Sequence, residues 1–202
     1  MLKTVQLTPR VAEIQIPAKE STFRAFIVTT SSGPVLVDAG IAEFADEFVA
    51  TVRRLNPRLL VVTERHWDHA DGLPKITAAL PDLKIAAHVK EAPGLPVPVD
   101  RLLEHDEMVV PGLRVLHVPG HSQGNIALLL EDEGTLLTGD SVFGKGDYAP
   151  ELSSPPARYS DDAALAKENI KILLRYPFER AILSHGDHLL EDAKTKIAAL
   201  VE

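Results

Sequence analysis

The chain has 202 residues, of which 45% are hydrophobic and 25% are charged, as in an ordinary soluble globular protein. This length predicts a single domain over residues 1–202 with a substantial core. The formal net charge of −8 argues against nucleic acid as a partner, and the absence of cysteine excludes disulfides, thiolate metal sites and a cysteine nucleophile. No apolar run approaches the length of a membrane span or of a secretory signal core, so we expect a cytoplasmic protein that does not bind membranes.

The first part of the chain predicts three strands and one helix. Alternating or continuous apolar, β-branched residues place the strands at residues 11–16, 23–30 and 35–37. Residues 42–55 carry apolar side chains at helical spacing, which predicts an amphipathic helix that ends before Pro57.

A charged cluster follows the next predicted strand, at residues 59–63. It has the sequence TERHWDHADG over residues 63–72, and a helix is predicted to begin after Gly72. The cluster is therefore expected on a loop that leaves the carboxyl end of a strand. Its carboxylates and imidazoles would repel or desolvate one another unless a cation binds them, although a solvated loop anchored by Trp67 is the alternative. The ligand candidates are Glu64, His66, Asp68 and His69.

The next part of the chain predicts one more strand and two hairpins. The strand is expected at residues 84–88, and the proline-rich stretch at 93–98 is expected to form a surface loop. The hairpins span residues 107–118 and 126–138, each with a glycine-containing turn.

The last part of the chain predicts two helices around a strand. Residues 144–158 show no periodicity, so no element is predicted there. Ser160 is expected to cap a helix that runs to about Tyr176, a strand is expected at 180–183, and a final helix is expected from about Leu189. The strands thus fall into two groups, each with hairpins and each followed by helices, which favours two packed sheets with helices outside.

Three further ligand candidates lie at predicted strand ends. His121 lies in the sequence PGHSQGN, Asp140 ends the sequence LLTGD, and His185 lies in the sequence ILSHG. Each residue also has a simpler explanation: a turn histidine, an Asx-turn aspartate and a helix N-cap, respectively.

These motifs together resemble those of the metallo-β-lactamase fold superfamily. The HWDH sequence at residues 66–69 matches the family signature His-x-His-x-Asp-His, except that Glu64 replaces the first histidine. The stretches around His121, Asp140 and His185 resemble the family's other ligand motifs in the same order, and VLVDAG at 35–40 resembles a structural motif, so Asp38 is expected to be structural. The resemblance implies an α/β fold, the αβ/βα four-layer sandwich of two face-to-face mixed sheets with helices outside.

The resemblance also implies a centre of two divalent metal ions, with zinc as the expected metal. Glu64 adds a hard oxygen ligand, which moves the preference toward manganese or iron. One ion would be held by Glu64, His66 and His121, the other by Asp68, His69 and His185, and Asp140 would bridge both.

The implied function is metal-dependent hydrolysis of an ester-type carbonyl, such as a thioester or a lactone, by a metal-activated bridging hydroxide. Asp68 would be catalytic, orienting the nucleophile and passing a proton to the leaving group. A small-molecule substrate is expected, a homo-oligomer is compatible with the sequence, and Lys145, Tyr148 and Tyr159 are candidate substrate contacts. Two alternatives stay open: a mono- or di-iron oxidoreductase with the same ligands, and a non-catalytic module that binds a metal or a partner.

Overall fold

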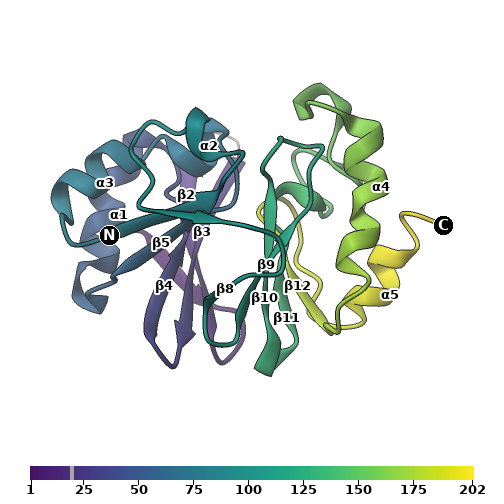
Figure 1. Cartoon of the computed structure of the whole chain (residues 1–202), viewed down its shortest axis with the longest axis horizontal. Helices are drawn as coiled ribbons and strands as arrows, with labels where there is room; N and C mark the ends of the chain where they lie inside the picture. The colour runs from purple at the N-terminus through teal and green to yellow at the C-terminus, as the bar shows by residue number, and fades with distance from the viewer. Residues whose placement is uncertain (19–20) are drawn as a thin grey trace. The chain divides into compact units, whose positions relative to one another are not determined.

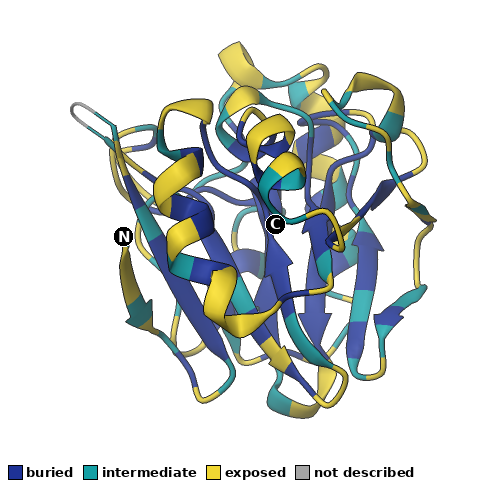
Figure 2. Ribbon diagram, turned by 90° about the vertical axis from the view of Figure 1, so that its left-hand side faces the viewer, coloured by how far each residue is buried: buried dark blue, intermediate teal, exposed yellow. Residues whose placement is uncertain are grey.

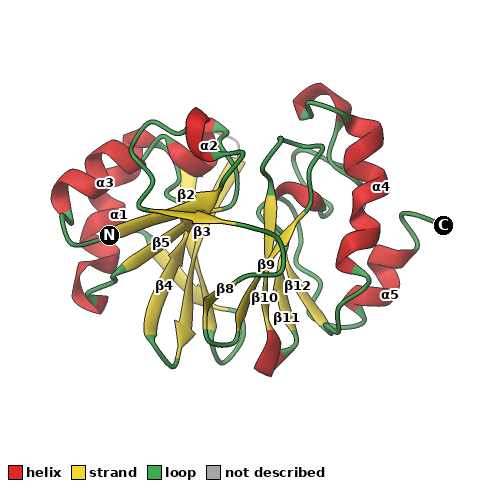
Figure 3. Ribbon diagram, in the orientation of Figure 1, coloured by secondary structure: helices red, strands yellow, loops and turns green. Residues whose placement is uncertain are grey.

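The computed structural model describes residues 1–18 and 21–202, which form two compact units, Met1–Leu102 and Leu103–Glu202 (Figure 1). Each unit contains one mixed β-sheet and its own helices (Figure 3). The predicted α/β class with two mixed sheets is therefore confirmed, whereas a single domain over residues 1–202 stays a prediction.

The sheet of the first unit has seven strands in sequence order. The strands are β1 (Lys3–Gln6), β2 (Val11–Ala18), β3 (Ser21–Thr30), β4 (Gly33–Val37), β5 (Leu59–Val62), β6 (Lys84–His88) and β7 (Arg101–Leu103). The first four strands form an antiparallel meander, and β4, β5 and β6 pair in parallel. All five predicted strands are confirmed, and β1 and β7 are additional. Because parallel strands end at the same edge, the segments that follow β4, β5 and β6 meet there.

The first unit has three α-helices, α1 (Ala45–Val52), α2 (Trp67–Ala70) and α3 (Leu73–Ala79). The predicted helix at 42–55 is confirmed as α1 with a short 3-10 turn at each end, and it packs against α3. The signature stretch was predicted to be a loop, which is wrong for α2. A helical turn forms there because the His66 carbonyl accepts hydrogen bonds from the backbone N–H groups of His69 and Ala70, both at 3.0 Å.

The sheet of the second unit has five strands in the order β12, β11, β10, β9, β8. The strands are β8 (Met108–Val110), β9 (Leu113–His117), β10 (Ile126–Leu130), β11 (Thr135–Leu137) and β12 (Arg180–Ile182). Strands β8 to β11 are antiparallel neighbours, which confirms both predicted hairpins, and β12 lies parallel to β11. Strands β9, β11 and β12 consequently run in one direction, and the segments that follow them lie at one edge of the sheet.

The two helices of the second unit are α4 (Ala163–Leu173) and α5 (Ala193–Ala198). The prediction that Ser160 caps α4 is wrong, because the Asp162 carboxylate accepts the hydrogen bond from Leu165 N at 2.9 Å. The helix also ends at Leu173, before the predicted end near Tyr176.

The last helix begins at Ala193, so the predicted start near Leu189 is also wrong. Leu189 instead forms an isolated β-bridge with Ala181, through backbone hydrogen bonds of 2.7 and 2.9 Å. A β-bridge needs extended backbone, which keeps Leu189 out of the helix.

Buried residues follow the strands and one face of the helices (Figure 2). In the second unit, Leu116 and Leu129 of the sheet share one core with Ile170 of α4 and Ile197 of α5. These helices therefore cover one face of their sheet (Figure 1). Across residues 1–18 and 21–202, no helix has both the length and the apolar character needed to cross a membrane.

Candidate metal centre

The first unit contains four of the predicted ligands, and the buried carboxylate of Glu64 lies close to two of the others. Its Oε2 lies 2.8 Å from His66 Nδ1 and accepts a hydrogen bond of 3.0 Å from the His66 backbone N–H. Its Oε1 lies 3.5 Å from His69 Nε2, and Asp68 Oδ2 lies 3.8 Å from the same nitrogen. Glu64 is fully buried and His69 is 2% exposed. The structure thus brings together Glu64, His66, Asp68 and His69.

Asp38 fixes the orientation of His69. Its Oδ2 accepts the Nδ1 proton of His69 at 2.9 Å, which leaves Nε2 directed toward the Glu64 and Asp68 carboxylates. Thr63 holds Asp38 in turn, because Asp38 Oδ1 accepts from the Thr63 backbone N–H at 2.7 Å and Oδ2 accepts from the Thr63 hydroxyl at 2.8 Å. A carboxylate behind a ligand histidine is the usual way to set its tautomer, so Asp38 has the structural role predicted for it.

Backbone hydrogen bonds join the turn after β4 to the signature loop after β5. Ala39 N donates to His69 O at 2.8 Å, and Gly72 N donates to Gly40 O at 3.0 Å. The contact requires glycine at position 72, because a Cβ there would lie 2.4 Å from the Ala39 carbonyl oxygen. The ligand loop is therefore held by main chain as well as by Asp38.

Glu91 also helps to hold the ligand loop, a role that the sequence patterns did not predict. It is fully buried, and its Oε1 accepts from Arg65 N at 2.8 Å and lies 3.3 Å from Arg65 Nη1. Arg65 lies between Glu64 and His66, so Glu91 anchors the chain between two candidate ligands. The sequence offers one indication of this role. Glu91 follows β6 closely, and β6 pairs in parallel with β5, so the segments after both strands lie at the same edge of the sheet.

The second unit gathers the remaining three predicted ligands. His121 Nε2 and His185 Nε2 each lie 3.2 Å from Asp140 Oδ2. All three residues are buried, with exposed fractions of 5% or less. The Asp140 carboxylate thus lies between two imidazoles, and its role as a ligand shared by two ions stays a prediction.

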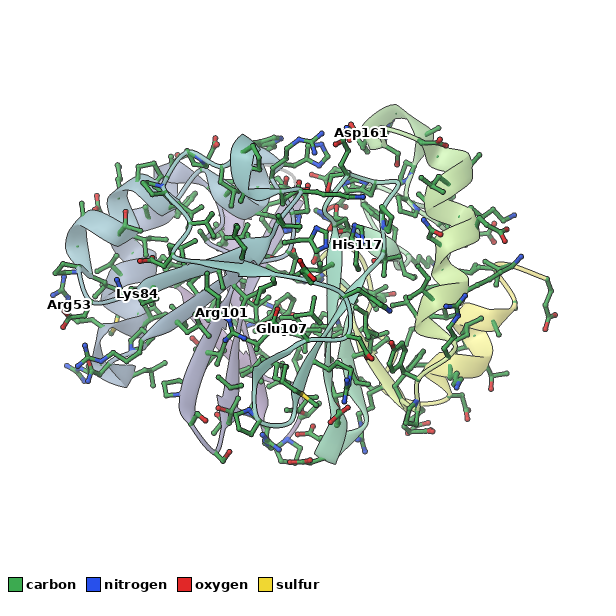
Figure 4. The ribbon with its side chains drawn as sticks, in the orientation of Figure 1. Arg53, Lys84, Arg101, Glu107, His117 and Asp161 are labelled. Atoms are coloured by element: carbon green, nitrogen blue, oxygen red, sulfur yellow. The ribbon has the colours of Figure 1, made fainter. Side chains whose placement is uncertain are left out.

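The His121 loop is docked on the beginning of α4. Asp161, labelled in Figure 4, donates its backbone N–H to His121 O at 2.9 Å, and Ser160 Oγ lies 3.5 Å from His121 Nδ1. Gly120 has φ of +132° and leaves no room for a Cβ, which would lie 2.2 Å from Ala166 N. Ser160, predicted as a helix cap, therefore lies beside a candidate ligand instead.

Asn125 connects the segments that carry His121 and Asp140. Its side chain is fully buried and accepts from Asp140 N at 3.2 Å. The Nδ2 group donates to Val118 O and to Ser141 Oγ, both at 2.9 Å. The last residue of the PGHSQGN motif thus fixes the backbone on which Asp140 is placed.

Aromatic rings surround His185. Phe143 stacks on its ring with centroids 4.8 Å apart, and Tyr148 meets it edge-on at 4.7 Å. Tyr159 lies 5.8 Å from Tyr148. Of the three predicted substrate contacts, Tyr148 therefore touches a candidate ligand, Tyr159 touches Tyr148, and Lys145 has an exposed side chain.

The spacing of the donor atoms fits bound metal ions. Ligands about 2.0–2.1 Å from a tetrahedral ion are about 3.4 Å apart. The nitrogen–oxygen pairs described above within each unit are separated by 2.8 to 3.8 Å. Imidazole and carboxylate donors without thiolate suit zinc, manganese or iron.

A sequence model of the metallo-beta-lactamase superfamily matches residues 24–185, which include all seven candidate ligands. The chain belongs to this superfamily. The resemblance inferred from the motifs is therefore confirmed, and the superfamily is one that binds metal ions.

Two curated relatives illustrate the similarity. The "Lactamase-like protein ptaB" of Pestalotiopsis fici is 31% identical over 74% of this chain and 50% of its own length. The "Atrochrysone carboxyl ACP thioesterase" of Emericella nidulans is 33% identical over 72% of this chain and 48% of its own length. The chain spans about half the length of these relatives.

Solved structures show the same fold. The metallo-beta-lactamase FIM-1 from Pseudomonas aeruginosa, in its mono-zinc form, matches with a TM-score of 0.77 and 17% identity, over 99% of this chain and 94% of its own. TTHA1623, in a di-iron-bound form, matches with a TM-score of 0.66 and 25% identity, over 93% of each chain. The predicted fold class is confirmed as the metallo-β-lactamase α/β fold.

Proposed function

We propose that this protein is a metal-dependent hydrolase of ester-type carbonyls, and that thioesters are its substrate class. The observation that carries the proposal is the pair of ligand sets, in which each carboxylate lies 2.8 to 3.8 Å from an imidazole nitrogen. The relatives named as ACP thioesterases favour a thioester over a lactone. A thioester is one of the small-molecule substrates that the sequence predicts. The cytoplasmic location stays a prediction.

We infer that the two ligand sets share one metal centre. Zinc is the first candidate, and the extra carboxylate of Glu64 makes manganese or iron a good alternative. The support is the family membership of a chain in which every ligand position is filled by a suitable donor. The first ion would be held by Glu64, His66 and His121, the second by Asp68, His69 and His185, and Asp140 would contact both.

When bound, the metal ions supply a hydroxide nucleophile at neutral pH and stabilise negative charge on the carbonyl oxygen. The chain supplies the proton transfer. The Asp68 carboxylate, 12% exposed, accepts the proton of the nucleophile and returns it to the departing thiolate. Asp38 holds His69 in one tautomer, so Nε2 stays directed toward the Asp68 side of the loop.

A second candidate is an oxidoreductase that uses one or two iron ions. Glu64 favours it, because the additional oxygen ligand suits iron, and the related TTHA1623 structure is in a di-iron-bound form. Oxygen consumption by iron-loaded protein, measured beside thioester hydrolysis by the same sample, separates the two activities.

The test is a hydrolysis assay with acyl thioesters and lactones on protein of known metal content. We expect thioester cleavage that is lost with EDTA and restored by zinc, manganese or iron. Asp68→Asn should lower kcat by about 10²–10⁴-fold while metal content is retained, because the proton transfer is lost. Full activity in metal-free protein would overturn the proposal.

A further inference from the structure

A series of ring contacts leads from His185 to the protein surface. Phe143 is 1% exposed and stacks on the imidazole at an interplanar angle of 16°, so it belongs to the core. Tyr148 is half-buried and contacts His185 edge-on, and Tyr159, which contacts Tyr148, is 41% exposed. Two large aromatic side chains thus remain partly in solvent, one in contact with His185 and the other in contact with the first, and such rings favour stacking with a bound molecule.

The backbone beneath these rings is held in place, although it has little regular structure. Phe143 and Ser153 form a two-way backbone bridge with hydrogen bonds of 3.0 and 2.9 Å. Gly146 N donates to Ala149 O at 2.8 Å, which closes a turn around Tyr148, and Asp187 N donates to Lys145 O at 2.9 Å. Tyr159 N also donates to Pro156 O at 3.0 Å, so the backbone of both tyrosines is held in place, as a binding surface requires.

Arg158 adds a positive charge to this surface. Its Cζ lies 4.7 Å from the centre of the Tyr159 ring, and the residue is exposed. Within residues 1–18 and 21–202, no carboxylate forms an ion pair with Arg158, in a chain whose formal net charge is −8. A guanidinium stacked on a ring keeps its in-plane N–H groups available for a carboxylate.

We propose that Tyr148, Tyr159 and Arg158 bind the acyl group of the substrate and select a planar aromatic acyl group that carries a negative charge. This inference rests on the proposed function, in which the substrate carbonyl would be bound at the metal centre to which His185 contributes. The tyrosine rings stack on a planar acyl group, and the guanidinium pairs with its carboxylate. A flexible aliphatic acyl group gains neither interaction.

The test compares hexanoyl, benzoyl and 4-carboxybenzoyl thioesters of N-acetylcysteamine on metal-loaded protein. The leaving group is the same in all three, and each kcat/KM is divided by the rate constant for hydroxide hydrolysis of the same thioester without protein, because the acyl groups differ in intrinsic reactivity. The remaining differences report recognition of the acyl group. We expect benzoyl to exceed hexanoyl by about tenfold through stacking, and 4-carboxybenzoyl to exceed benzoyl by about tenfold through the ion pair.

Variants assign each preference to its residues. The double variant Tyr148→Leu with Tyr159→Leu should lose the preference for benzoyl over hexanoyl, whereas Tyr148→Phe with Tyr159→Phe should keep it. Arg158→Ala should lose the preference for 4-carboxybenzoyl over benzoyl. Lys167→Ala, which removes one exposed charge from α4, is the matched control and should keep both preferences.

Equal values of kcat/KM for the three thioesters, after division by their rate constants for hydroxide hydrolysis, would overturn the inference and leave the proposed function standing. If none of the three thioesters is cleaved, the proposed function fails. The inference is then tested separately by calorimetry, which compares the binding of terephthalate with that of hexanoate. Terephthalate binding that weakens about tenfold in the double leucine variant supports the aromatic surface. Terephthalate binding equal to that of hexanoate, or unchanged in the variant, overturns it.

Discussion

At the residue scale, Glu64 determines the charge of the proposed metal centre. It stands where the family signature has a histidine, it is fully buried, and it lies 2.8 Å from His66 Nδ1. A carboxylate here leaves the centre with one positive charge fewer than an imidazole would. A less positive centre lowers the pKa of a bound water less.

Replacing this carboxylate should therefore change both metal preference and pH dependence. We expect Glu64→His to raise the share of zinc relative to manganese and iron, and to move the acidic limb of the pH–rate profile to lower pH. Competitive metal loading followed by elemental analysis measures the first effect. Glu64→Gln, which removes the charge but keeps the shape, is the control. Identical metal proportions in wild type and Glu64→His would show that Glu64 is not a ligand.

Glu91 should matter for metal binding, although it is not proposed as a ligand. It holds the Arg65 backbone between Glu64 and His66, so Glu91→Ala should weaken zinc binding by about 10–100-fold. Glu91→Gln retains an oxygen acceptor for Arg65 N, so its zinc affinity should fall less than that of Glu91→Ala. Competition with a zinc chelator gives the affinities, and Glu43→Gln at an exposed position should leave them unchanged. Wild-type affinity in Glu91→Ala would contradict this role.

At the scale of elements, the beginning of α4 supports the His121 loop. Asp162 caps the helix, and its backbone N–H donates to Gly120 O at 2.8 Å. Asp162→Ala should lower the free energy of unfolding by about 1 kcal/mol, since the Leu165 N–H loses its side-chain partner. Chemical denaturation measures the loss. Glu168→Ala on the exposed face of α4 should cost less than about 0.5 kcal/mol, and equal losses would show that the cap is not responsible.

The end of α4 is tied to the turn before β8 by Asp106. The Tyr176 hydroxyl donates to Asp106 Oδ1 at 3.0 Å, and Arg114 Nη1 donates to the same oxygen at 2.9 Å. The hydrogen bond from Tyr176 and the nearby Arg114 lower the pKa of Asp106 below its usual 3.8. A lowered folded-state pKa stabilises the fold above the unfolded-state pKa, and this stabilisation is lost as the pH falls through the folded-state value.

Asp106→Asn should therefore be less stable than wild type near neutral pH, and the difference should shrink below about pH 4. Urea denaturation at a series of pH values measures this trend. Asp147→Asn, at an exposed position, should show no such trend. A difference that stays constant down to the lowest pH would mean that the Asp106 charge is not involved.

Sequence patterns predicted elements well where apolar periodicity was strong, as in β2, β6 and the hairpins of the second unit. They failed where two neighbouring side chains could each form the same short-range hydrogen bond. Ser160 and Asp162 are both good helix caps, and only the structure shows that Ser160 lies against His121. The short helix α2 was missed because one turn has no periodicity to detect.

At the scale of the whole molecule, all seven ligand candidates could be named from motifs, since each follows a predicted strand. The residues that hold these ligands in place could not be named, because they are distant in sequence from the ligands. Asp38 and His69 are 31 positions apart, and Glu91 and Arg65 are 26 apart. The ring contacts of Tyr148 with His185 join a segment without periodicity to a strand end. Pairings of this kind are set by the sheet topology, which local patterns do not specify.

The central claim is that the ligand sets of both units bind the same metal ions. Crystals of protein purified without chelators, measured at the zinc, iron and manganese absorption edges, locate each ion by its anomalous scattering. We predict one ion within bonding distance of Glu64, His66 and His121, a second within bonding distance of Asp68, His69 and His185, and Asp140 in contact with both. Ions bound by the ligands of one unit alone, or ions bound elsewhere, would contradict the account.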